Sequence, residues 1–309
     1  MRTGPVLVRL IALTLLVLLP ATAFAVDGVI EINHARALAG NVTPGDTPGY
    51  PVTVSLPGSY RLTGNLTQAN AGTHVIEVTA SSATIDLNGF GLRGATTCTR
   101  GPGPTTCAPV GQGHGIKATG EVTVHGGRIE GISGHGVMGG SNATLRVSEV
   151  TFTNIAGTAI YNTSSSPSLV ERCLVDGVGM MGIAIGSGIV RDSAVAYCGD
   201  YGIVANRASV VSGCTVAFAV GGIYADGALV HNCSVYSTSE VGVNARDALL
   251  VETLVRKSDG YGIENDDGVT TLGSNVILEA TQGQIQAPGK VVVTAPNSCP
   301  SNNLPAFCP

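Results

Sequence analysis

The chain has 309 residues, a formal net charge of −5 at neutral pH, no Trp and 43 Gly residues. Only 12% of the residues are charged, which excludes a disordered polyelectrolyte, and the absence of Lys/Arg clusters argues against a nucleic-acid partner. High Gly content with many Val, Ile and Thr residues favours a turn-rich β-protein over a helical one.

The first 25 residues have the pattern of a secretory signal peptide. Arg2 and Arg9 form a positively charged region that precedes an apolar run from Leu10 to Leu19. Residues 23–25 (AFA) have the form of a cleavage site. The run is too short to span a bilayer, and no later segment approaches a membrane span. We therefore expect cleavage after residue 25 and a secreted/extracellular or periplasmic location.

Residues 26–73 precede a clear repeat. Residues 43–51 (TPGDTPGYP) are rich in turn formers, and residues 52–67 alternate polar and apolar side chains like two short strands about a Pro-Gly turn. We expect this segment to cap the N-terminal end of a repeat array. Without a cap, the end coil would expose an apolar cross-section and unpaired strand edges.

A repeat of about 20 residues fills residues 74–295. Successive segments open with Gly or Ala followed by Ile or Val, at positions 115, 136, 159, 182, 202, 222, 242 and 262, so the last four steps are 20 residues each. Short apolar runs follow in each segment, often as V-x-x-C-x-V, without a helix-length amphipathic period. Because a doubly wound α/β fold needs crossover helices, it is excluded. Repeats this short must stack on their neighbours to bury an apolar face.

The coils resemble the right-handed parallel β-helix, or pectin-lyase-like, superfamily, and within it secreted bacterial members of unassigned function. The resemblance covers about residues 74–295. It implies an all-β, single-stranded solenoid of roughly ten coils, followed by a C-terminal cap over residues 296–309. It does not fix an activity, because the superfamily includes lyases, hydrolases, epimerases, tailspikes and non-catalytic proteins.

The eight cysteines are of two kinds. Cys98 and Cys107 bracket a Gly/Pro-rich insertion, and Cys299 and Cys308 bracket the C-terminal tail, so we expect each pair to form a local disulfide. The others lie inside the repeats at positions 173, 198, 214 and 233, where we expect free, buried thiols.

Two points about these internal cysteines stay open in the sequence. A bridge between Cys214 and Cys233 remains an alternative, since adjacent coils lie within disulfide range. Cys198 has no evident partner.

Three charged residues occupy equivalent positions near the end of successive opening strands. Asp226, Arg246 and Asp266 should stack at intervals of about 4.8 Å. As catalytic residues they would resemble the arrangement of pectate lyases, in which carboxylates on neighbouring coils hold Ca²⁺ and an arginine takes a proton. The two aspartates, about 9.6 Å apart, would alternatively suit an inverting glycosidase. No lyase or polygalacturonase motif accompanies them, and a solvated salt-bridge ladder is the competing interpretation.

The outward face of the opening strands offers candidate substrate-binding residues. Tyr161, Tyr224, Asn244 and Glu264 alternate with inward residues and should point to solvent, where tyrosine rings can pack on sugar faces. No cofactor is evident, and Ca²⁺ enters only with the lyase interpretation.

Two histidines precede opening glycines. His114 and His135 should stack on adjacent coils. Without a third ligand in their column a metal site is weak, and we expect surface turn histidines.

The function favoured by the sequence is binding of a polysaccharide or cell-surface glycan without catalysis. A polysaccharide lyase or glycoside hydrolase is one alternative, and a structural or adhesive rod is another. Deep catalytic clefts are usually built from long loops, and here only the Cys98–Cys107 insertion is long.

Overall fold

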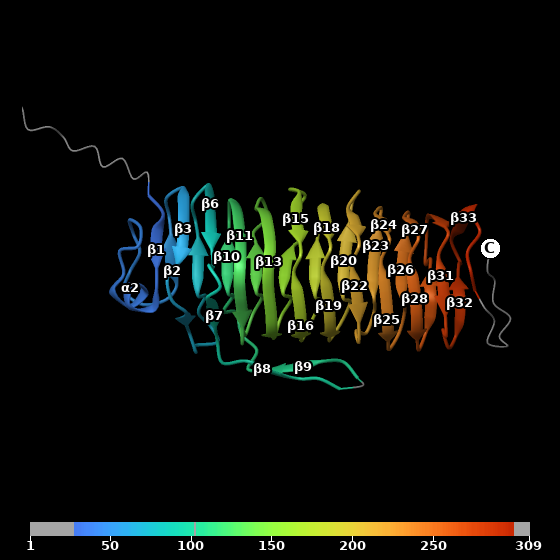
Figure 1. Cartoon of the computed structure of the whole chain (residues 1–309), viewed down its shortest axis with the longest axis horizontal. Coiled ribbons are helices and arrows are strands. Elements are labelled where there is room, and N and C mark those ends of the chain that lie inside the picture. Colours follow the sequence, from blue (N-terminus) through green and yellow to red (C-terminus); the bar gives the residue numbers. More distant parts are fainter. Residues whose placement is uncertain (1–27, 102, 300–309) are drawn as a thin grey trace, which may run out of the picture.

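The chain winds into an elongated rod of stacked coils (Figure 1). The computed structural model describes residues 28–101 and 103–299. The expected signal peptide lies outside these residues, as does Cys308, so the Cys299–Cys308 bridge stays a prediction. The all-β fold class is confirmed: parallel strands form a solenoid with eleven strands in one of its sheets.

The first sheet contains the strand that opens each coil, and its parallel register runs from end to end. Its strands are β2 (Val52–Val54), β5 (Ile76–Val78), β10 (Ile116–Ala118), β12 (Val137–Gly139), β14 (Ile160–Asn162), β17 (Ile183–Ile185), β20 (Ile203–Asn206), β23 (Ile223–Asp226), β26 (Val243–Arg246), β29 (Tyr261–Glu264) and β32 (Gly283–Gln286). We call its outer surface the opening face.

Two further parallel rows complete each coil, and the long strands β11 and β13 join them into one sheet of 20 strands. The first row contains β1 (Ile30–Ile32), β3 (Gly58–Leu62), β6 (Ser82–Asp86), β11 (Glu121–Glu130), β13 (Thr144–Ile155), β15 (Ser168–Glu171), β18 (Gly188–Arg191), β21 (Val210–Ser212), β24 (Leu229–His231), β27 (Leu249–Val251), β30 (Val269–Gly273) and β33 (Lys290–Ala295). The second row continues from β4 (Leu66–Thr67) and β7 (Gly91–Arg93) to β16 (Leu174–Val178), β19 (Ala194–Cys198), β22 (Thr215–Ala217), β25 (Ser234–Thr238), β28 (Leu254–Ser258) and β31 (Val276–Leu278).

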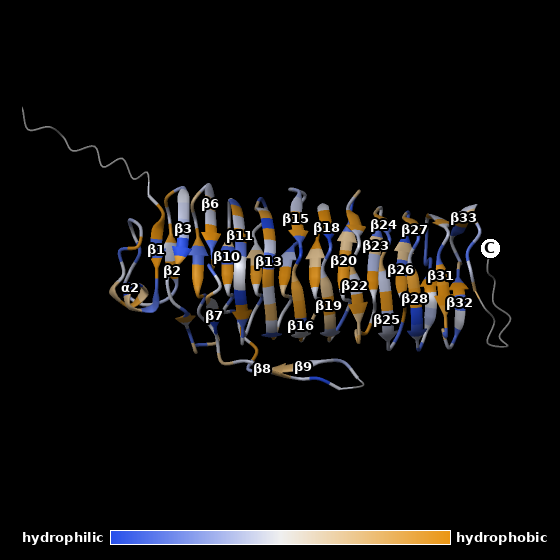
Figure 2. Ribbon diagram, in the orientation of Figure 1, coloured by the Kyte–Doolittle hydropathy of each residue, from blue (hydrophilic) through white to orange (hydrophobic). Residues whose placement is uncertain are grey.

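Alternation along the strands builds the interior. In β20, Ile203 and Ala205 are fully buried while Val204 between them is partly exposed. The same pattern recurs along the rod, where apolar residues concentrate in the strands (Figure 2). Each fully buried aliphatic side chain contributes about 1.5–3 kcal/mol, so stacking supplies the core that a single coil lacks.

At most opening positions the tight stacking of coils leaves room only for Gly, and Ala159 is the exception. A Cβ at Gly222 would lie 2.1 Å from the carbonyl oxygen of Gly242 and 2.4 Å from Val235 Cγ1. The Gly242 oxygen belongs to the backbone of the next coil, so it cannot retreat without separating two coils. The Gly in the Gly-Ile repeat is therefore explained by the lack of space for a Cβ between stacked coils.

The internal cysteines are free and buried, as predicted. Burial raises the pKa of Cys173 to about 11, and it also raises the pKa of Cys198. A hydrogen bond with Cys233, together with burial, raises the pKa of Cys214. These thiols pack as small apolar groups rather than as nucleophiles.

The N-terminal segment 26–73 contains both a short helix and a coil. Helix α2 (His34–Ala39) begins after Asn33, whose side chain accepts a hydrogen bond from the Arg36 N–H. Strands β2, β3 and β4 then pair in register with β5, β6 and β7, so a complete coil precedes His74. No helix in the described part of the chain is long and apolar enough to cross a membrane.

The predicted disulfide between Cys98 and Cys107 is confirmed. It joins β8 (Thr97–Thr99) to β9 (Thr106–Ala108), which pair antiparallel in a hairpin outside the solenoid. The hairpin lies alongside the rod rather than projecting from it (Figure 1).

Candidate functional site

Three of the predicted binding residues lie side by side on the opening face. Tyr224 pairs in register with Asn244, and Asn244 with Glu264. The Asn244 amide donates a hydrogen bond of 2.9 Å to Asp266 Oδ2. Predicted residues from three successive coils thus form one polar group. The expectation that Asn244 points to solvent is wrong, because its side chain is buried at 7% exposure.

A hollow of about 240 Å³ adjoins this group at the corner where each coil turns back into its opening strand. We call it the tyrosine–carboxylate pocket. Its lining residues are Tyr201, Ser239, Glu240, Val241, Gly260, Tyr261, Glu264 and Gln282. Of these residues, only Glu264 is predicted from the sequence. The available signal was the residue just before each opening Gly, which is Tyr at positions 201 and 261.

The ring of Tyr201 packs against the backbone of the next coil at Gly221. A Cβ at Gly221 would lie only 2.3 Å from Tyr201 Cε1, so the ring rests directly on the Gly221 backbone. The ring also meets that of Tyr224 edge-on, with centroids 5.7 Å apart and planes at 70°. Because Tyr224 pairs in register with Asn244, this contact ties the pocket to the predicted polar group.

Negative charge gathers in the pocket, where Glu240 and Glu264 line the hollow and Asp266 lies close to them. Within residues 28–101 and 103–299, no Lys, Arg or His forms an ion pair with Glu240, Glu264 or Asp266. Desolvation raises the pKa of Glu264, and the charges of Asp266 and Glu240 raise it further. Burial and the same acidic neighbours raise the pKa of Tyr201 to about 12, so its hydroxyl remains protonated at neutral pH.

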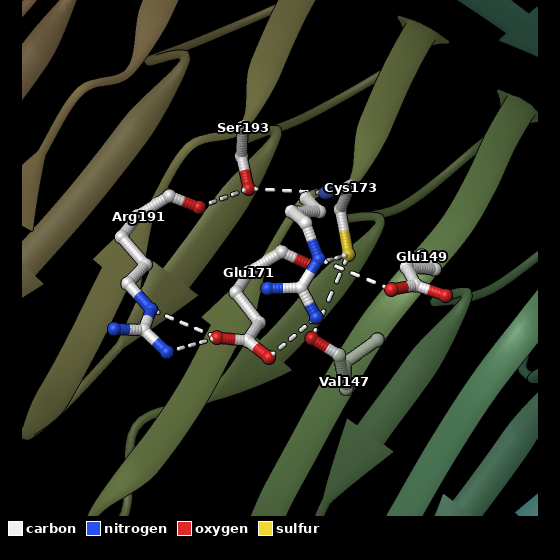
Figure 3. A network of polar contacts seen from close by, with 7 residues as sticks. Val147, Glu149, Glu171, Cys173, Arg191 and Ser193 are labelled. Carbon is white, nitrogen blue, oxygen red and sulfur yellow. Dashed lines mark hydrogen bonds and ion pairs between the residues drawn. The ribbon is translucent and has the colours of Figure 1, made fainter.

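About half of the carboxylates in the described part of the chain form ion pairs, and one group of them builds a ladder. On the first row of the long sheet, Arg172 Nε lies 3.1 Å from Glu149, and Arg191 Nε lies 2.8 Å from Glu171. The two guanidinium groups hold the pKa of Glu171 below its usual range. Figure 3 shows this ladder beside the inward Cys173 and Ser193. The unpaired acids of the pocket therefore differ from the structural ladder.

The predicted Asp226–Arg246–Asp266 column forms only in part. Asp226 and Arg246 are in register, but the backbone pairing of the next strand ends at Glu264. Arg246 lies 3.6 Å from Asp267 in an exposed ion pair. The catalytic role of these three residues stays a prediction.

Tyr161 lies away from the pocket, at the end of an aromatic stack. The rings of His74, His114, His135 and Tyr161 stack in that order, with centroid separations of 4.8, 5.2 and 4.7 Å. The predicted stacking of His114 on His135 is confirmed. His74 extends the stack at one end and Tyr161 at the other.

The expectation of surface turn histidines is wrong for His114, which is only 6% exposed. His114 Nδ1 accepts a hydrogen bond of 2.9 Å from the His135 backbone N–H, and His74 and His135 accept equivalent bonds. Burial and the neighbouring imidazoles lower the pKa of His114 to about 3. The stack is therefore a neutral structural ladder.

No group of three or more His, Cys, Asp or Glu residues in the described ranges is placed to hold a metal ion. The Ca²⁺ of the lyase interpretation stays a prediction.

Comparison with known proteins identifies the fold. The family model described as "Right handed beta helix region" matches residues 107–228. A comparison with curated protein sequences gives no match.

The similar solved structures are catalytic domains of GH87 alpha-1,3-glucanase. A variant in complex with tetrasaccharides has a TM-score of 0.44 and 13% identity, covering 79% of this chain and 62% of that one. A second tetrasaccharide complex has a TM-score of 0.42 and 11% identity, covering 88% and 69%. A complex with nigerose has a TM-score of 0.39 and 11% identity, with the same coverage. This chain thus spans less than two thirds of the first of these domains, and the sugars bound there are properties of those proteins.

Proposed function

We propose that this right-handed parallel β-helix repeat protein binds a glycan in the tyrosine–carboxylate pocket, without catalysis. The observation that carries the proposal is the Tyr201 ring, seated on the Gly221 backbone at the edge of a hollow whose acids have no cation partners. A solvated structural face needs neither feature.

The lining chemistry matches a sugar. Rings of Tyr201 and Tyr261 offer apolar surface to the C–H face of a pyranose, and Glu240 and Glu264 offer acceptors for its hydroxyls. Because the acids are unpaired, a uronate would be repelled. The proposed ligand is therefore a neutral or amino-bearing glycan.

The incomplete column of predicted catalytic residues favours binding over catalysis. Asp226 pairs in register with Arg246, but the next strand pairing ends at Glu264, before Asp266. The arginine of the lyase interpretation is paired with Asp267.

A panel of neutral, amino-bearing and uronate oligosaccharides tests the proposal by calorimetry, with turnover measured in parallel. We expect neutral or amino-bearing glycans to bind, and Tyr261→Ala to weaken binding about tenfold. Tyr161→Ala is the matched control, since that ring lies on the opening face but outside the pocket.

Each alternative function has its own outcome in this panel. Turnover of uronate chains that requires Ca²⁺ and Arg246 would replace binding with the lyase interpretation. If no glycan binds, the remaining function is that of a structural or adhesive rod.

A further inference from the structure

The hairpin β8–β9 packs against the solenoid at two glycines, where the absence of a side chain allows a close approach. A Cβ at Gly177 would lie 2.5 Å from the Arg100 guanidinium, and one at Gly199 would lie 2.7 Å from the carbonyl oxygen of Thr105. Arg100 Nη2 also reaches both Asp176 Oδ2 at 3.2 Å and the Asp176 carbonyl oxygen at 3.1 Å. Two successive coils thus hold the hairpin in place.

Beyond these contacts the hairpin borders two hollows. One, of about 510 Å³, is lined by Arg100, Gly101, Asp176, Tyr197 and Phe218. The other, of about 280 Å³, is lined by Gly101, Gly103, Phe218, Ala219, Ser237, Thr238, Ser239 and Asp259. Phe218 and Gly101 belong to both, so we treat the two as one groove and call it the hairpin groove.

Two aromatic rings, Tyr197 and Phe218, line this groove, and Tyr236 continues the row outside its lining. Tyr197 and Phe218 stack with centroids 4.8 Å apart, and Tyr236 meets Phe218 edge-on at 5.8 Å. Phe218 is 42% exposed. Aromatic residues are rare in this protein, since Phe, Tyr and Trp together make up 4% of the whole chain. Three rings on consecutive coils beside a groove are therefore a concentration that composition alone does not supply.

The backbone at this row is unfavourable for aromatic residues. Tyr197 and Phe218 have φ of 54° and 53°, a left-handed conformation that costs a bulky residue free energy. The preceding coil has Gly177 at the equivalent position, with φ of 77°. Later coils have Ser237, Lys257 and Glu279 at this left-handed position, so the corner accepts non-Gly residues in general. What is unusual is the bulk of the two aromatic side chains, which β-propensity and turn chemistry do not favour there.

The hairpin groove is continuous with the tyrosine–carboxylate pocket. Ser239 lines both, and Asp259 of the groove is followed directly by Gly260 of the pocket. From the coil of Phe218 to that of Gln282 is a span of three coils, or about 14 Å along the rod. A chain-like ligand can therefore occupy both hollows at once.

We propose that the hairpin groove is a second glycan subsite, which extends the tyrosine–carboxylate pocket so that a long sugar chain is bound along the corner of the rod. The inference rests on the proposed function of the pocket. Ring surface at Tyr197 and Phe218 packs on sugar C–H faces, while Ser237, Ser239 and Asp259 bond to hydroxyls.

A peptide strand fits this groove less well than a glycan. Extended peptides gain affinity by pairing with an exposed sheet edge. Strands β19 and β22 beside the groove are already paired on both sides, with β16 and β25 as their outer neighbours. The solenoid strands beside the groove therefore offer side-chain surface and hydroxyls but no free backbone edge.

Chain-length dependence tests the proposal. With a neutral oligosaccharide series from disaccharide to octasaccharide, we expect wild-type affinity to rise about tenfold with length, because only the longer members reach both hollows. Phe218→Ala should lower octasaccharide affinity about fivefold and leave disaccharide affinity unchanged. Ile189→Ala is the control, since Ile189 is 40% exposed but lies on β18 away from the groove.

Two comparisons separate the outcomes. Phe218→Gly, which suits the left-handed backbone, repeats the test without loss of stability. Gly221→Ala, which displaces the pocket ring, should weaken short and long chains alike. Affinity that is independent of length and of Phe218 would overturn the groove while leaving the pocket intact. Absence of binding to any glycan would overturn both.

Discussion

Replacing Gly221 by Ala displaces the ring of Tyr201 without opening the solenoid. The new Cβ would lie 2.3, 2.4 and 2.8 Å from three ring carbons. Carbon atoms pack comfortably at about 3.5–4.0 Å, so the ring must retreat by about 1.2 Å or more. The obstruction is a partly exposed side chain rather than backbone, and Gly221 has no left-handed φ. The coil can therefore keep its register while the ring swings outward.

The displacement has a small stability cost and a larger functional one. Loss of the edge-on contact between Tyr201 and Tyr224 costs about 1 kcal/mol, which lowers the melting temperature by a few degrees. Glycan contact with the ring contributes about 1–1.5 kcal/mol, so affinity should fall about tenfold.

Calorimetric titration with a neutral oligosaccharide, beside a thermal denaturation, measures both effects. Gly140→Ala is the matched control, because its nearest neighbour would lie at 3.4 Å, an ordinary contact. Wild-type affinity in Gly221→Ala, with a ring shown by NMR to have moved, would refute the role of Tyr201 in the pocket.

Four further predictions concern stability and the hairpin. Gly222→Ala should destabilise the fold by about 2 kcal/mol or more in urea unfolding, because the obstructing atom belongs to the next coil's backbone; wild-type stability would contradict the steric origin of the repeat. The raised pKa of Glu264 stabilises the fold fully only below its unfolded value of 4.5, and this advantage is lost as pH rises. Glu264→Gln should thus gain in melting temperature relative to wild type between pH 4 and pH 8, and a constant difference would argue against the effect. The lowered pKa of His114 acts oppositely: stability present above pH 6.5 should fall as pH drops towards 3, and an imidazole that titrates near 6.5 by NMR would contradict the buried stack. Asp176→Ala should cost less than about 1 kcal/mol, since its pair with Arg100 is partly exposed, yet speed proteolysis of the hairpin; unchanged proteolysis would show that the pair does not hold it.

The 20-residue period of the sequence predicted the fold because stacked coils of equal length can pair their strands in only one register. Gly-Ile at equal intervals places each opening strand on the last, and the observed pairs of Asn206 with Asp226 and Asp226 with Arg246 follow from counting. Alternation then places Ala205 and Ala225 inside. These features depend only on backbone geometry and side-chain size.

The site was less predictable because it lies where the repeat geometry ends. The ladder stops at Glu264, so Arg246 reaches Asp267 rather than Asp266. The seat of Tyr201 on Gly221 depends on the shape of the corner, which the strand pattern does not describe. Counting residues likewise gives the length of the hairpin but not the side of the rod on which it lies.

Fluorine NMR of the chain labelled with fluorotyrosine tests the central claim most directly, because the eight tyrosines sample the whole rod. On titration with a neutral oligosaccharide, resonances of Tyr201, Tyr224 and Tyr261 should shift together, while those of buried Tyr60 and stacked Tyr161 remain fixed. Shifts confined to Tyr161, or unchanged spectra with every glycan tried, would contradict the assignment of the tyrosine–carboxylate pocket as the binding site.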